Sequence, residues 1–139
     1  MVLEIPALAA HVNTARLFVG AVARHFGIDE GSVDDLKLAV SEACNGAIRV
    51  RAAEADDRPI RVAGMKEEGS LLIEVEDAVE PQVSAIASTT EDLVRGLGLE
   101  LIIALFPDVL MVPGSRGGTS VLLSLSLGTE PATPELPDA

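Results

Sequence analysis

The stretch that decides the fold is DDLKLAVSEACNGAI, residues 34–48. Its apolar residues recur at steps of three and four, which places them in one stripe along a helix. They are Leu36, Val40, Ala43 and Ala47. The stripe predicts an amphipathic helix that starts near Ser32, with Asp35 three residues later as a cap-like signal, and ends near Ala52. Such a helix must bury its apolar face against another layer.

Polar and small residues interrupt the middle of this helix. Asn and Gly both weaken a helix interior, Gly by about 1 kcal/mol relative to Ala, so Asn45 and Gly46 call for an explanation. In a functional interpretation, Glu42 is a carboxylate base or water orienter in a pocket and Asn45 lies near a metal. In a structural interpretation, Glu42 is an exposed residue beside a helix contact, where Gly46 permits close approach. Spacing alone leaves both open.

The segments on either side alternate between strand-like and helix-like patterns. A short edge strand ended by Pro6, a helix stopped by Gly27 and a hairpin around Gly69 are expected, followed by a polar stretch with little periodicity, an apolar helix and two strands. Their ranges are 2–5, 9–26, 58–65 with 70–77, 81–94, 99–106, 109–112 and 120–127. This order predicts an α+β two-layer sandwich, with helices on one face of a mixed, largely antiparallel sheet.

The expected core lies between the helices and the sheet. It consists of Leu36, Val40, Ala47, Ile73, Val75, Leu101, Ile102, Val121 and Leu123. In the last strand, Ser120, Ser124 and Ser126 alternate with apolar residues and should form a partly solvated face.

Composition excludes several classes of function. Ten basic against 22 acidic residues give a formal charge of -12, which would repel a phosphate backbone, so no nucleic-acid partner is expected. No apolar run approaches the roughly 18 residues of a membrane span, and the start of the chain does not read as a secretory signal. Among the 139 residues Cys44 is the only cysteine, which suits the cytoplasm.

The chain divides into one domain and a tail. Residues 1–127 carry all the periodic segments and are long enough for a single core. Residues 128–139 contain three prolines, three acids and no base, too little apolar surface to offset the cost of ordering, and are expected to be disordered.

Three further places carry candidate site residues. Asp77 ends a strand and could accept a hydrogen bond from an exocyclic amine, although an Asp that caps a turn explains it as well. Gly96 and Gly98 precede a helix whose N-terminus could attract an anion, but two glycines also suit a tight turn. Gly118 and Thr119 enter a strand, where Thr is ordinary.

These pieces, in this order, resemble the anti-sigma-factor serine-protein kinase family. That family is the small single-domain branch of the fold shared by gyrase, the Hsp-type chaperone, histidine kinase and mismatch-repair ATPases. The resemblance covers about residues 2–127. It is carried by TARLFV at 14–19, by residues 34–48, by Asp77, by RGLGLELI at 95–102 and by GGTSV at 117–121.

The resemblance implies a chemistry and a set of partners. Family members bind ATP with magnesium, hold a sigma factor as a homodimer, and phosphorylate a serine of a small antagonist protein. By the same correspondence Glu42 is the general base and Asp77 is the adenine-reading carboxylate. Asn45 is the candidate metal ligand that lies nearest to the family's metal-binding position. Thr119 with Gly118 accompanies the Asp77 carboxylate. Arg95, Gly96 and Gly98 form the phosphate-side loop, and residues 81–94 form a mobile lid.

Two departures from the family pattern affect the ATP site. The family places its magnesium-binding Asn four residues after the Glu, where this chain has Gly46, and Asn45 comes only three residues after Glu42. Neighbouring helix positions point about 100° apart, so Asn45 aims away from the expected metal unless a π-bulge shifts it. Moreover, the residues after Asp77 are not the glycines of the family.

Three hypotheses follow. The favoured one is a regulatory binding protein that sequesters or releases a sigma factor or antagonist, with weak or lost ATP binding. The second is an active serine-protein kinase of the anti-sigma type. The third is a structural domain that retains only the fold.

Overall fold

The computed structural model describes residues 1–53, 55–77, 99–114 and 118–127. Within these residues the sheet contains five strands in the order β1-β2-β3-β5-β4. The strands are β1 (Val2–Ile5), β2 (Ile60–Glu67), β3 (Ser70–Asp77), β4 (Leu110–Pro113) and β5 (Thr119–Ser126). All four pairings among the described strands are antiparallel, where the sequence analysis allowed a mixed sheet.

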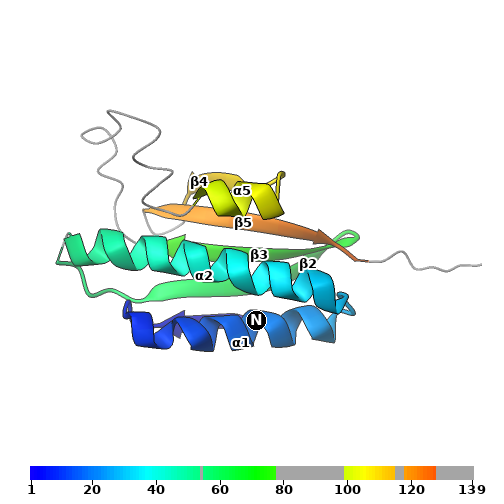
Figure 1. The fold of residues 1–139 in the computed structure, drawn as a ribbon, viewed down its shortest axis with the longest axis horizontal. Coiled ribbons are helices and arrows are strands. Elements are labelled where there is room, and N and C mark those ends of the chain that lie inside the picture. Colours follow the sequence, from blue (N-terminus) through cyan, green and yellow to red (C-terminus); the bar gives the residue numbers. More distant parts are fainter. Residues whose placement is uncertain (54, 78–98, 115–117, 128–139) are drawn as a thin grey trace, which may run out of the picture.

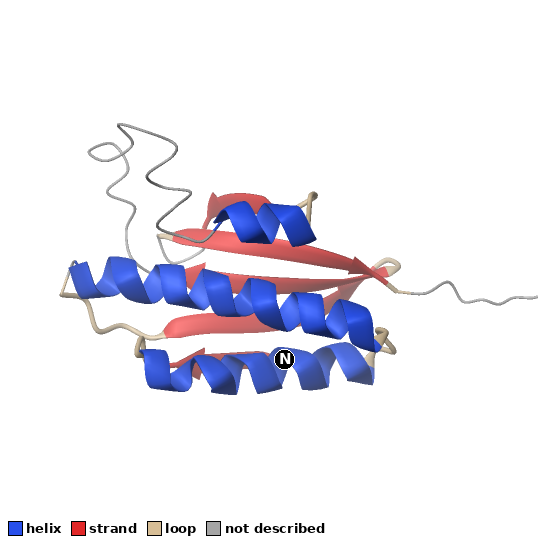
Figure 2. Ribbon diagram, in the orientation of Figure 1, coloured by secondary structure: helices blue, strands red, loops and turns tan. Residues whose placement is uncertain are grey.

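The helices cover one face of this sheet, as predicted (Figures 1 and 2). They are the 3-10 helix η1 (Ala9–His11), α1 (Val12–His25), α2 (Glu30–Ala53) and α5 (Leu99–Leu105). Figure 1 shows α1 and α2 side by side, with α5 beyond α2 along β5. The described part of the chain is therefore a two-layer α+β sandwich, and α2 lies between its two neighbouring helices.

Local chemistry explains where α1 ends and α2 begins. Gly27 has a φ of +79°, a left-handed conformation that only glycine adopts at little cost, and it stops α1 as predicted. The start of α2 differs from the prediction. Asp29, rather than Ser32, caps the helix: its carboxylate accepts the Ser32 amide at 3.0 Å and the Ser32 hydroxyl at 2.9 Å. The helix therefore begins two residues earlier, at Glu30.

The hairpin predicted around Gly69 is present. Its φ of +76° closes the turn between β2 and β3. In β5 the apolar alternation also holds, because Val121, Leu123 and Leu125 are buried against the helices.

The prediction of a partly solvated face on β5 is wrong at one residue, because Ser120 is fully buried. Its hydroxyl donates to Glu74 Oε2 at 2.7 Å. Arg61 lies between Glu74 and Glu76 at 3.3 and 3.5 Å, on the sheet face away from the helices. This polar cluster surrounds Ser120 and takes the place of solvent.

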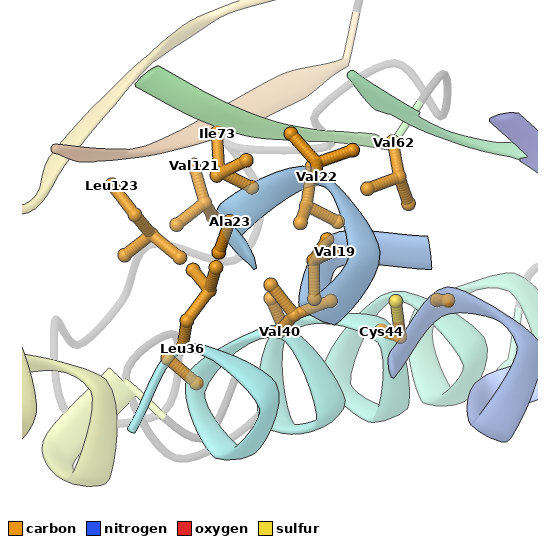
Figure 3. Close-up of a cluster of buried hydrophobic side chains, with 14 of the residues drawn as sticks. Val19, Val22, Ala23, Leu36, Val40, Cys44, Val62, Ile73, Val121 and Leu123 are labelled. Atoms are coloured by element: carbon orange, nitrogen blue, oxygen red, sulfur yellow. The ribbon is translucent and has the colours of Figure 1, made fainter. Parts of the chain in front are cut away.

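The core lies where the two layers meet. Figure 3 shows side chains of α1 and α2, among them Val19 and Leu36, facing Ile73 and Leu123 of the sheet. Eight of the nine predicted core residues are buried. Leu101 is the exception at 37% exposed, because α5 turns its neighbour Ile102, at 0%, toward the core.

Candidate functional site

The polar segment Ser41–Ile48 lies in the second half of α2. The helix is regular α-helix from Glu30 to Ala53, with no π-bulge at Asn45. Each residue therefore advances by about 100° around the axis, and the side of the helix that a position occupies follows from its spacing to a residue of known contact.

One side of α2 faces α5. Asp35 and Ser32 line a groove whose opposite wall is formed by Leu105 and Phe106, at the end of α5. Glu42 follows Asp35 by seven residues and Gly46 follows it by eleven, close to two and three full turns. Both positions therefore lie within about 20° of Asp35 around the axis. Glu42 is half-buried and Gly46 is buried.

The other side of α2 faces α1. Ser41 donates its hydroxyl hydrogen to the Lys37 carbonyl at 2.8 Å and accepts a bond from Arg16 Nη1 of α1 at 3.5 Å. Asn45, one turn after Ser41, lies within about 40° of it on this side. It is half-buried and sits about 100° from Gly46 around the axis. Asn45 also lies about 60° from Glu42, on the same face of the helix, but it is turned toward α1, whereas Gly46 is turned toward α5.

The end of the central strands brings two other candidate residues together. Asp77 is the last residue of β3 and pairs in register with Thr119, the first residue of β5. Gly118, the residue before Thr119, is buried and has a φ of +74°, a conformation that favours glycine. Asp77 and Thr119 therefore lie at one end of the sheet on adjacent strands, although 41 residues separate them along the chain.

The other candidate residues cannot be placed. Arg95, Gly96 and Gly98, together with residues 81–94, lie outside the described residues.

Sequence reasoning did not single out Arg16. Its Nη1 reaches Ser41, but its Nε is buried and has no hydrogen-bond partner in the described part of the chain. The available signal was a basic residue in the middle of the helical segment TARLFV. The sequence did not show that α2 lies beside this residue.

The buried cysteine and the metal-ligating side chains of the described residues do not form a further reactive site. Burial raises the pKa of the Cys44 thiol to about 12, so it stays protonated and unreactive near neutral pH. Among the residues that the structure describes, no three His, Cys, Asp or Glu side chains are grouped closely enough to hold a metal. No helix in the described ranges is long and apolar enough to cross a membrane.

Comparison with known proteins identifies relatives. The family model described as "Histidine kinase-like ATPase domain" matches residues 5–125. Serine-protein kinase RsbW of Listeria monocytogenes serotype 4a is 31% identical over 118 residues, covering 77% of this chain and 75% of that protein. RsbW of Oceanobacillus iheyensis is 29% identical over 139 residues, covering 92% of this chain and 87% of that protein.

A solved structure has the same fold. A chain in the crystal structure of the SiaB-SiaC complex from Pseudomonas aeruginosa matches with a TM-score of 0.64 over 90% of this chain and 88% of that one. Sequence identity is 14%, so the likeness concerns the fold alone.

Proposed function

Because this chain belongs to the histidine kinase-like ATPase domain family, in its anti-sigma serine-protein kinase branch, we propose that it is a partner-switching regulator with weakened or lost ATP binding. In this role it binds a sigma factor, a small antagonist protein, or each in turn, in the cytoplasm. Its control comes from competition between partners rather than from phosphoryl transfer.

The observation that carries the proposal is the position of Asn45. Magnesium takes oxygen ligands in near-ideal octahedral geometry, so small adjustments do not bring into place a ligand that is displaced by about 100° around a helix. On the α5 side of α2 only Glu42 supplies oxygen atoms near the expected position, because Gly46 has no side chain. The residues present therefore do not fit a family-type magnesium site, and we derive no catalytic step through one.

The sequence after Asp77 supports the same conclusion. Asp77 is followed by Ala78, Val79 and Glu80, which lack the backbone freedom of the family's glycines. Without a cation, the carboxylate of Glu42 would repel an ATP polyanion beside it.

The alternative is an active ATP- and magnesium-dependent serine-protein kinase with Glu42 as general base. The in-register pair of Asp77 and Thr119 favours it, because the residues that would read adenine are side by side. Active transfer would require Asn45 to reach the metal through a shifted helix.

Titration calorimetry on two matched variants separates these functions. Gly46→Asn puts an amide oxygen on the α5 side, and Asn45→Ala removes the amide on the α1 side. We expect Gly46→Asn to strengthen magnesium-dependent ATP binding and Asn45→Ala to leave it unchanged. The reverse ranking, or phosphorylation of an antagonist serine by the unaltered chain, would support the active kinase.

A partner experiment tests the regulatory role directly. The chain is mixed with a candidate sigma factor, and a candidate small antagonist protein is then added. We expect the antagonist to displace the sigma factor equally well with ATP and magnesium and with EDTA. Failure of the chain to bind any sigma factor or antagonist of its own organism would favour the structural-domain hypothesis.

A homodimer is part of the proposal. β1 is an edge strand of the described sheet, and the exposed stripe of α1 beside it is uncharged from Asn13 to Ala21, before the exposed Arg24. Its uncharged residues are Asn13, Thr14, Leu17 and Ala21. Leu17, at 61% exposed, is the large apolar residue of this stripe. Two copies that meet across a twofold axis would cover it.

Leu17→Glu should yield monomers in size exclusion with light scattering. Leu38→Glu is the matched control, because Leu38 of α2 is also exposed, at 39%, and receives the same charge. A monomeric unaltered chain, or equal effects of the two variants, would contradict this interface.

A further inference from the structure

One groove lies at the opposite end of β5 from Thr119. It has a volume of about 550 Å³ and lies between the start of α2, the end of α5 and the end of β5. Thr119 and Ser126 stand at opposite ends of β5, and seven residues of strand span about 23 Å. A ligand in this groove would therefore leave the Asp77 and Thr119 end of the sheet free. Figure 1 shows these two ends of the sandwich.

The groove combines an apolar floor with an acidic wall. Ile28, Leu125, Leu105 and Phe106 supply the apolar surface. Ile28 and Leu125 are almost fully buried, and Leu105 and Phe106 are half-buried against the core. The apolar surface of the groove is therefore held in place by core packing. No Lys, Arg or His is among the described residues that line the groove.

One carboxylate of the acidic wall, that of Asp29, is held in place by hydrogen bonds. Asp29 accepts two hydrogen bonds from Ser32, which lower the pKa of its carboxyl group. Asp35 lines the same wall. The neighbouring Glu30 differs, since its carboxylate is held by Arg24 at 2.8 and 3.1 Å. Ser124 and Ser126 of β5 complete the opposite end.

We propose that this groove docks a segment of a partner protein in which basic and apolar residues alternate. An apolar side chain would lie on the floor, and a Lys or Arg would extend to Asp29 and Asp35. Anionic membranes and nucleic acids carry the wrong charge. Residues 128–139 of this chain, with three acids and no base, also have the same charge as the groove. The inference goes beyond the proposed function and does not depend on ATP binding.

Nuclear magnetic resonance on the ¹⁵N-labelled full chain tests it, with a short amidated peptide of alternating lysine and leucine as the probe. We expect amide shifts to concentrate at Asp29, Ser32, Asp35, Phe106 and Ser126. A peptide of alternating lysine and serine should bind more weakly, because it cannot use the apolar floor. A peptide of alternating glutamate and leucine should not bind.

Matched variants locate the charge effect. Asp29→Asn keeps a capping side chain and removes its charge, and Asp35→Asn removes the second charge. Each should weaken lysine-leucine binding by about twofold to fivefold, the size of a solvent-accessible ion pair. Asp34→Asn is the control, because Asp34 is an exposed acid of the same helix that does not line the groove. Its effect should be smaller than twofold.

Three results would overturn the proposal. One is the absence of binding by the unaltered chain. Another is an equal loss on Asp34→Asn, which would indicate general attraction to an acidic protein. The third is a set of shifts confined to the edge strands β1 and β4, which would indicate strand pairing.

Discussion

Ile102 of α5 should contribute far more to stability than its neighbour Leu101. Ile102 is fully buried, whereas Leu101 is 37% exposed. Ile102→Ala removes hydrocarbon worth about 2.4 kcal/mol at about 0.8 kcal/mol per buried methylene. The cavity left behind adds to this, so the expected loss is about 2.5 to 5 kcal/mol. Leu101→Ala should cost about 1 kcal/mol or less, because the side chain already contacts water.

Urea unfolding followed by far-ultraviolet circular dichroism measures both variants. The chain contains no Trp or Tyr, so intrinsic fluorescence is a poor probe. Protein concentration must be held constant, since dimerisation would contribute to stability. We expect Ile102→Ala to lower the midpoint by about 1 to 2 M, and Leu101→Ala to shift it far less. Equal midpoints, or a larger loss for Leu101→Ala, would refute the placement of α5.

Three other outcomes are expected. Gly64→Ala should destabilise the fold by about 1 to 3 kcal/mol in the same assay, because a Cβ at this position would lie 2.9 Å from Val22 Cγ1. The Cys44 thiol should react with a chromogenic disulfide only as fast as the protein unfolds, since it is buried with a pKa near 12. A hydrogen bond from Arg58 lowers the pKa of Asp56 from 3.8 to about 2. The stability that this carboxylate adds should therefore be present above pH 4 and lost as the pH falls through 2. Near pH 2 the free energies of unfolding of Asp56→Asn and the unaltered chain should converge.

Periodicity was sufficient to predict most of the fold. The 3.6-residue stripes of α1 and α2 and the alternation of β5 each identify the buried face, because burial is what the period records. Boundaries depended on finer chemistry. The cap at Asp29 was missed, since the same segment also offers Ser32 with the spacing of a capping box.

α5 shows the limit of pattern reading. Its residues are nearly all apolar, so no period distinguishes the buried position from the exposed ones. Only the way α5 packs on α2 and the sheet selects Ile102 over Leu101. The burial of Ser120 has a similar cause, because Glu74 and Arg61 come from other strands.

The candidate site was also only partly predictable from the sequence. The one-residue shift of Asn45 relative to Glu42 is visible in the sequence, and the regular α2 helix converts that shift into a rotation of about 100° away from the position of Gly46. The sides themselves come from contacts with α1 and α5, through Arg16 and through Leu105 and Phe106. Neither contact has a signal in α2 alone.

The affinity of the unaltered chain for ATP, measured by calorimetry in excess magnesium and again in EDTA, tests the central claim most directly. With Asn45 on the α1 side of a regular helix, we expect dissociation constants weaker than about 100 μM, less than about 5.5 kcal/mol of binding, and the same value with and without the metal. Micromolar affinity that disappears in EDTA would contradict the account, because it would require a magnesium ligand where this chain has Gly46.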